Sequence, residues 1–135
     1  MSQENVEIVR DSWRAFARSG LDATAEYWDA EISWRAIEGA PDDVGEIEGR
    51  DALRRYYQDW IDTFAGLTVA PTELLEVDDD RLVASHHATG RARRSGVETE
   101  LRYAVVYTLR EGKIVRGREY SDRQQALKAV GLQDG

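Results

Sequence analysis

Cysteine is absent from this chain, and the sequence holds only two prolines, two histidines and one methionine. The lack of cysteine excludes disulfide bonds and thiolate metal sites. No apolar run approaches the roughly 20 residues that a transmembrane helix needs. The N-terminal residues 1–5 are polar and acidic, so they do not resemble a signal peptide. We therefore expect a cytoplasmic protein that makes no use of a membrane.

Positively charged residues are also fewer than negatively charged ones. The chain has 18 Lys and Arg against 26 Asp and Glu, which gives a formal net charge of -8. Because phosphate backbones are bound by basic clusters, this balance argues against nucleic acid as a partner. Hydrophobic residues make up 41% and charged residues 33% of the chain, as in an ordered globular protein. A length of 135 residues fits one domain, 1–135, with a core of its own.

The first half of the chain has the period of amphipathic helices. In its first helix Val6, Val9, Trp13 and Phe16 form one apolar stripe, and Gly20 follows as a stop signal. The predicted elements are a helix over 3–18, a second helix capped by Asp22 and running through Trp28, a short strand over 32–36, a loop over 37–49 and a third helix over 51–63.

The second half changes to the period of strands. Pro71 indicates an edge position or a bulge, and Asp122 is a suitable cap for a closing helix with Ala126, Leu127 and Val130 inward. Helices followed by strands in hairpin order favour an α+β fold, with helices on one face of an antiparallel sheet. The predicted strands are 67–77, 81–93, 97–110 and a last one from Lys113.

Several short stretches of the chain resemble one known family. They are Asn5-Val6-Glu7-Ile8-Val9, Gly20-Leu21-Asp22, Gly49-Arg50-Asp51-Ala52-Leu53 and the last hairpin, Thr108 to Val115. In these words and in the order of its elements the chain is similar to the nuclear transport factor 2-like superfamily, in its SnoaL-like (polyketide cyclase-like) branch. The resemblance implies a cone-shaped α+β barrel, in which a curved, mostly antiparallel sheet wraps around three N-terminal helices and a short C-terminal helix follows. It implies a deep cavity but not one activity, since ketosteroid isomerases, epoxide hydrolases, dehydratases, cyclases and non-catalytic scaffolds share the fold.

Strand alternation selects the side chains that face this cavity. Val115, Gly117 and Glu119 share one face of the last strand, which makes Glu119 the natural acid or base. His86 is predicted to face inward as well, either as a proton donor or as a structural histidine. Glu119 likewise has a structural alternative, as a carboxylate tied to a tyrosine or an arginine. The predicted substrate-binding residues are aromatic: Trp13, Tyr27, Trp34, Tyr57, Trp60, Tyr103 and Tyr107.

The resemblance also bears on one specific reaction. Glu119 falls where the epoxide hydrolases of the family have an aspartate within an Arg-Asp-Tyr word, which here is Arg118-Glu119-Tyr120. The partner arginine and aspartate of those enzymes fall at His86 and Ala88, so this chain lacks the full set of hydrolase catalytic residues.

The sequence shows no metal-binding pattern. His86 and His87 point to opposite faces of a strand and are not a metal pair, and residues 78–80 lack the spacing of a calcium loop. We expect no metal and no cofactor.

Two hypotheses about function follow. The first is a cofactor-independent isomerase, cyclase or dehydratase, in which Glu119 moves a proton on a small apolar carbonyl or cyclic compound. The second is a binding module or oligomeric scaffold whose cavity does no chemistry. In either case we expect a homodimer formed through the outer face of the sheet, with short side chains at its centre: Ser85, Thr89, Ala104, Val106 and Thr108.

Overall fold

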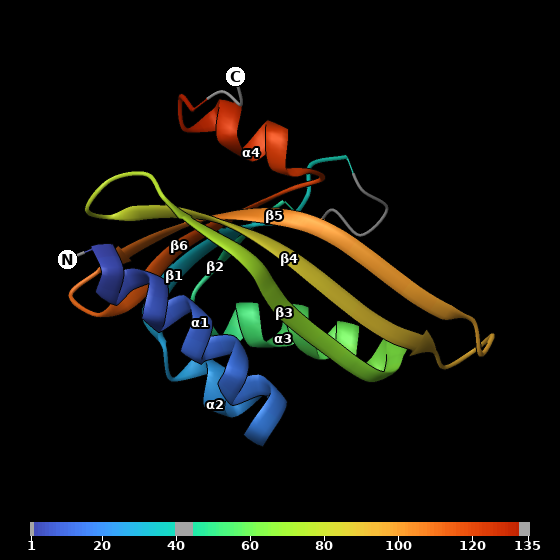
Figure 1. The fold of residues 1–135 in the computed structure, drawn as a ribbon. Helices are drawn as coiled ribbons and strands as arrows, with labels where there is room; N and C mark the ends of the chain where they lie inside the picture. Colours follow the sequence, from blue (N-terminus) through green and yellow to red (C-terminus); the bar gives the residue numbers. More distant parts are fainter. Residues whose placement is uncertain (1, 40–44, 133–135) are drawn as a thin grey trace.

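The computed structural model describes residues 2–39 and 45–132. Within these ranges the chain forms four helices and one six-stranded sheet (Figure 1). The elements are α1 (Ser2–Ser19), α2 (Leu21–Ala25), β1 (Trp28–Arg35), β2 (Glu46–Glu48), α3 (Arg50–Thr63), β3 (Phe64–Glu76), β4 (Arg81–Ala92), β5 (Glu98–Arg110), β6 (Lys113–Tyr120) and α4 (Arg123–Ala129).

The sheet has the strand order β2-β1-β6-β5-β4-β3. Every neighbouring pair is antiparallel except β1 and β6, which are parallel. The long strands curve over α1, α2 and α3, which lie together on one side, while α4 lies on the other (Figure 1). This arrangement confirms the predicted cone-shaped α+β fold. The sheet is not closed, because β2 and β3 remain as its edges.

The apolar stripe of α1 packs into the cone as predicted. Val9 and Trp13 are almost fully buried. Between them Ser12 is also buried, and its backbone carbonyl accepts a hydrogen bond of 2.8 Å from the Thr24 hydroxyl, which fastens α2 to α1. Gly20 takes a φ of 90° between the two helices, a conformation that glycine adopts at little cost. No helix among the described residues is long and apolar enough to cross a membrane.

The prediction for the second helix is wrong at both ends. Gly20 rather than Asp22 occupies the N-cap position, and α2 ends at Ala25. The Asp22 carboxylate instead pairs with Arg54 of α3. Trp28 does not end a helix but begins β1, where it pairs with Ile114 of β6 and is buried. Strand pairing and burial of the indole therefore override the local helical pattern.

The predicted loop over 37–49 contains a short strand. Ile47 of β2 pairs with Trp34 of β1 and is buried, so the loop prediction is wrong for Glu46–Glu48. Residues 40–44 of that prediction lie outside the described residues.

The edge strand β3 matches the proline signal. Pro71 lies on this outermost strand, and the register with β4 shifts directly after it.

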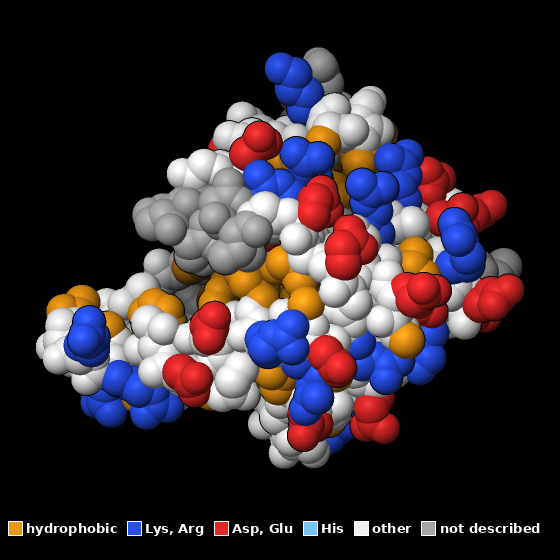
Figure 2. Space-filling model, turned by 180° about the vertical axis from the view of Figure 1, so that it is seen from behind, with side chains coloured by type: hydrophobic (Ala, Val, Ile, Leu, Met, Phe, Trp, Pro, Cys, Tyr) orange, Lys and Arg blue, Asp and Glu red, His pale blue; other side chains and the backbone are white. Residues whose placement is uncertain are grey.

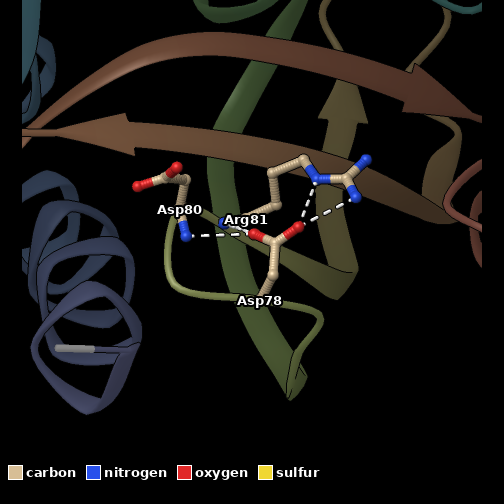
Figure 3. A network of polar contacts seen from close by, with 3 residues as sticks. All are labelled: Asp78, Asp80 and Arg81. Carbon is tan, nitrogen blue, oxygen red and sulfur yellow. Dashed lines mark hydrogen bonds and ion pairs between the residues drawn. The ribbon is translucent and has the colours of Figure 1, made fainter.

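The turn between β3 and β4 is held by the carboxylate of Asp78 (Figure 3). One carboxylate oxygen accepts hydrogen bonds from the backbone N–H groups of Asp80 and Arg81, at 3.0 and 2.8 Å. The other carboxylate oxygen binds the Arg81 guanidinium. The Arg81 side chain is the main cause that lowers the pKa of Asp78, and the backbone N–H of Asp80 acts in the same direction. These contacts explain why the acidic residues 78–80 form a turn.

The last strand carries a bulge that alters one predicted face. Opposite β5, Thr108 pairs with Arg116 and Leu109 pairs with Ile114, which leaves Val115 as the extra residue. Ile114 therefore joins Gly117 and Glu119 on the buried face, and Val115 is only half-buried. The prediction was wrong for Val115 because the alternation of side chains along one strand does not reveal a bulge.

Helix α4 covers one end of the outer sheet face. The Asp122 carboxylate accepts the N–H of Gln125 at 2.8 Å and caps the helix, as predicted. Ala126 and Leu127 are buried as predicted and lie in a second small core with Val83 and Ala104. Because Ala104 is 0% exposed within its own chain, its predicted place at the centre of a dimer interface is wrong.

Candidate functional site

A pocket of about 460 Å³ lies between helix α3 and strands β3, β4 and β5. Its walls come from the C-terminal half of α3, the start of β3, the end of β4 and the start of β5. Hydrophobic side chains are also gathered at the surface near the base of the projecting β4–β5 hairpin (Figure 2). Most of the lining is apolar or small, with two carboxylates: Tyr56, Asp59, Trp60, Thr63, Phe64, Leu67, Ala88, Thr89, Gly90, Thr99, Glu100 and Leu101.

Tyr56 connects this pocket to the buried carboxylate of Glu119. Its ring lines the pocket, and its hydroxyl lies 3.2 Å from both carboxylate oxygens of Glu119. The Trp34 indole N–H donates a further bond of 2.8 Å to the Glu119 Oε2 atom. Glu119 itself is 3% exposed and does not line the pocket. Among the described residues, Tyr56 is thus a pocket-lining side chain that links a pocket ligand to Glu119.

Gly117 explains how the Trp34 indole reaches Glu119. Trp34 and Gly117 are direct neighbours in the parallel β1–β6 pair, and Glu119 follows two residues later on the same face. A Cβ atom on Gly117 would lie 2.0 Å from the Trp34 Cζ3 atom. The missing side chain is therefore what lets the indole lie across β6.

His86 belongs to a second buried chain of hydrogen bonds. The Trp13 indole N–H donates to the Tyr107 hydroxyl at 2.9 Å, and that hydroxyl lies 2.9 Å from the Nε2 atom of His86. Burial lowers the pKa of His86 to about 3, so the ring is neutral at neutral pH. Since the Tyr107 oxygen already accepts from Trp13, its own proton is best directed at Nε2, which places the imidazole proton on Nδ1.

Two more phenols lie beside these networks. Burial is the main cause that raises the pKa of Tyr57 well above its usual value, with further contributions from Tyr103 and then Glu119. The pKa of Tyr103 is likewise raised, by burial first and by Glu119 second. Both phenols therefore remain protonated, and each hydroxyl has a proton that it can donate.

The predicted aromatic site residues lie in three different places. Trp60 lines the pocket, while Tyr27 is half-buried at the core boundary and has no ring contact with the other predicted aromatics. The remaining predicted residues form one buried cluster around Glu119 and His86: Trp13, Trp34, Tyr57, Tyr103 and Tyr107. Tyr56 was missed as a site residue. The sequence places it on the apolar face of α3, and nothing in that pattern distinguishes a pocket wall from a core position.

Among the described residues, no group of three or more His, Asp or Glu side chains could hold a metal ion. In the buried cluster around Glu119 and His86, the side chains available for chemistry are one carboxylate, several phenols, two indole N–H groups and a neutral imidazole. This set can accept a proton at Glu119 and donate hydrogen bonds to an oxygen atom.

The sequence model of the SnoaL-like domain matches residues 9–117. The chain belongs to the SnoaL-like domain family. The uncharacterised protein YesE of Bacillus subtilis (strain 168) is similar to this SnoaL-like chain: the two are 26% identical over 133 residues, covering 93% of this chain and 86% of YesE.

Solved structures share the fold of this SnoaL-like domain. Bal32a, from a soil-derived mobile gene cassette, superposes with a TM-score of 0.75 at 24% identity and covers 87% of this chain and 88% of its own. TerC, co-crystallised with polyporic acid, gives a TM-score of 0.75 at 20% identity over 94% of this chain and 98% of its own. The protein RV0760c of Mycobacterium tuberculosis, in complex with estradiol-17beta-hemisuccinate, gives 0.72 at 17% identity over 86% and 92%.

Proposed function

We propose that this SnoaL-like domain binds a small, largely apolar carbonyl compound in the pocket beside α3 and moves a proton on it through Tyr56 and Glu119. One observation carries the proposal: Tyr56 both lines the pocket and donates its hydroxyl to the buried Glu119 carboxylate. Buried carboxylates are costly and are concentrated at working sites. The apolar lining selects an apolar ligand.

The proposed reaction is a proton relay. The Tyr56 oxygen receives a proton from the carbon next to the ligand's carbonyl group as the Tyr56 hydroxyl proton passes to Glu119. The C–H electron pair moves into the new carbon–carbon double bond, and the carbonyl oxygen becomes an enolate. Return of the proton to the same carbon gives exchange, whereas return to a conjugated carbon gives an isomer. The Trp34 N–H holds the Glu119 carboxylate in place throughout.

The solved relatives support the ligand class. RV0760c holds a steroid ester and TerC holds polyporic acid, so the same fold accommodates cyclic molecules in two other proteins. Other structural neighbours are described as a putative isomerase from Bacillus subtilis and as putative polyketide cyclases. Isomerisation and aldol-type cyclisation both begin with an enolate, which is the species that the relay would form.

The test is deuterium uptake by cyclic enones and β-keto compounds in D₂O, followed by proton NMR. We expect the protein to accelerate exchange at the carbon next to the carbonyl. Glu119→Gln and Tyr56→Phe should each lower that rate by about 10²–10⁴-fold, because each removes one member of the relay. Tyr120→Phe is the matched control, since Tyr120 follows Glu119 on β6 but packs against the α4 side of the sheet.

A binding module without chemistry is the second candidate. It is favoured by the position of Glu119, which lies behind Tyr56 rather than in the pocket wall. If the protein binds the test ketones but exchanges no proton on any of them, or if Glu119→Gln exchanges as fast as the parent, the relay is wrong and the binding module stands.

A further inference from the structure

Three buried polar atoms of the aromatic cluster have no hydrogen-bond partner among the described residues. They are the hydroxyls of Tyr57 and Tyr103 and the Nδ1 atom of His86. Each belongs to a side chain that is at most 3% exposed. Native proteins rarely leave a buried donor unpaired, because the group has lost its water without gaining a partner. Three such atoms in one cluster therefore point to a ligand group that pairs with them.

The side chains that carry these atoms are joined in a closed circuit. Trp13 contacts Tyr57, Tyr57 contacts Trp60, and Trp60 contacts Tyr103. Tyr103 then stacks on His86, which contacts Trp13 again. The neighbouring ring centroids are 5.1–5.9 Å apart. The unpaired atoms thus belong to one compact group of side chains.

This circuit lies directly inward of the pocket. The cross-strand pair Ala88 and Leu101 lines the pocket, and the next pair on the same face of β4 and β5 is His86 and Tyr103. Two residues along a strand span about 7 Å. Trp60 forms the boundary, since it lines the pocket and also contacts Tyr57 and Tyr103. A ligand that turns the half-buried Trp60 indole aside would meet the unpaired atoms.

We propose that the group behind Trp60 receives the carbonyl oxygen of the pocket's ligand, with Tyr57 and Tyr103 as the two hydrogen-bond donors and His86 Nδ1–H as a third. The ligand is then an apolar ketone or quinone, because three donors require an acceptor. This inference rests on the proposed function, since it specifies how the ligand of that pocket is held. In that reaction the same donors would stabilise the enolate oxygen.

The electrostatics of the cluster agree with this position. After burial, Glu119 is among the causes that raise the pKa of both Tyr57 and Tyr103. The contact geometry agrees as well, since the Tyr57 ring lies 5.2 Å from the ring of Tyr56, whose hydroxyl binds Glu119. In the proposed binding mode, an oxygen bound by Tyr57 therefore places its neighbouring carbon on the side of the Tyr56–Glu119 pair.

The experiment compares two probes of nearly equal shape, 9-fluorenone, which has a carbonyl oxygen, and fluorene, which lacks it. Equilibrium binding and melting temperature are measured for the parent, Tyr57→Phe and Tyr103→Phe. We expect each variant to bind fluorenone roughly three- to ten-fold more weakly, the effect of one neutral hydrogen bond, and to bind fluorene as the parent does. The carbonyl stretch of bound fluorenone should lie at higher frequency in the variants than in the parent.

Melting temperature supplies the second criterion. Without ligand, both variants should melt at or above the parent's temperature, because each removes an unpaired buried hydroxyl. Tyr107→Phe is the control: it deletes a hydroxyl that is paired with Trp13 and His86, so it should melt lower.

Two results would overturn the inference. The first is unchanged fluorenone affinity in both variants while both probes bind the parent. The second is a drop in melting temperature in both variants, which would show that the hydroxyls are already paired, for example by a buried water molecule. Failure of both probes to bind the parent would contradict the pocket itself, and with it the proposed function. Loss of proton exchange with normal probe binding would contradict the relay alone.

Discussion

Gly117 is the residue on which the geometry around Glu119 depends most directly. Gly117→Ala would force its Cβ atom against the Trp34 ring, which is fixed by burial and by its bond to Glu119. Overpacking of this kind typically costs about 1–3 kcal/mol. We expect a loss of stability in that range in urea unfolding, together with a change in tryptophan fluorescence.

A second substitution tests the cause of that loss. Trp34→Phe shortens the ring system that the new methyl group would strike, so Gly117→Ala should cost less in the Trp34→Phe background than in the parent. An equal cost in both backgrounds would show that Trp34 does not occupy the space above Gly117.

His86 makes stability dependent on pH. Burial lowers its pKa from 6.5 to about 3, so between these values the unfolded chain binds a proton that the folded protein excludes. The free energy of unfolding must then fall as pH is lowered through this window, and His86 contributes no such dependence above it.

The measurement is urea unfolding of the parent and of His86→Gln from pH 7.5 to pH 3.5. Carboxylates also titrate at the acid end, so the comparison between the two proteins is what isolates His86. We expect the parent to lose more stability on acidification than the variant, with His87→Gln as the control for losing a histidine. Parallel curves for the parent and His86→Gln would contradict a buried neutral imidazole.

At the scale of elements, the period of the sequence predicted most of the fold. The stripe on α1, the hairpin order of β3 to β6, the edge proline and the cap of α4 are all local patterns, and all are present. Three of the errors have one cause in common. The end of α2, the start of β1 and the strand β2 depend on pairing between distant segments, which a local pattern does not contain.

The candidate site, like the fold, was predictable only in the part that depends on local patterns. Alternation on β4 and β5 correctly turned His86, Tyr103 and Tyr107 inward. The bulge at Val115 and the role of Tyr56 were not predictable, because each depends on how another element is placed. The pocket was not predictable either. Strands β3, β4 and β5 all contribute to its lining, and the sequence of any one strand does not show how the three come together.

For the whole molecule, the uncovered part of the outer sheet face is the proposed homodimer surface. Helix α4 covers Ala104 and the Ser85 hydroxyl is buried, but Thr108 remains only half-buried there. We expect light scattering at micromolar concentration to give the mass of a dimer. Thr108→Arg, which places a long charged side chain on this face, should give a monomer. A monomeric parent protein would contradict the prediction.

The account as a whole depends on Tyr56 and Glu119 acting as one unit. When two residues form a single relay, the effects of substituting them on the rate are not additive, because the loss of either residue interrupts the same proton path. The most direct test is therefore the rate of deuterium exchange in the parent, Tyr56→Phe, Glu119→Gln and the double variant, measured on one ketone at saturating concentration. We predict that the three variants are slowed about equally. A double variant slowed by the product of the two single effects would show that Tyr56 and Glu119 act independently, and would contradict the relay.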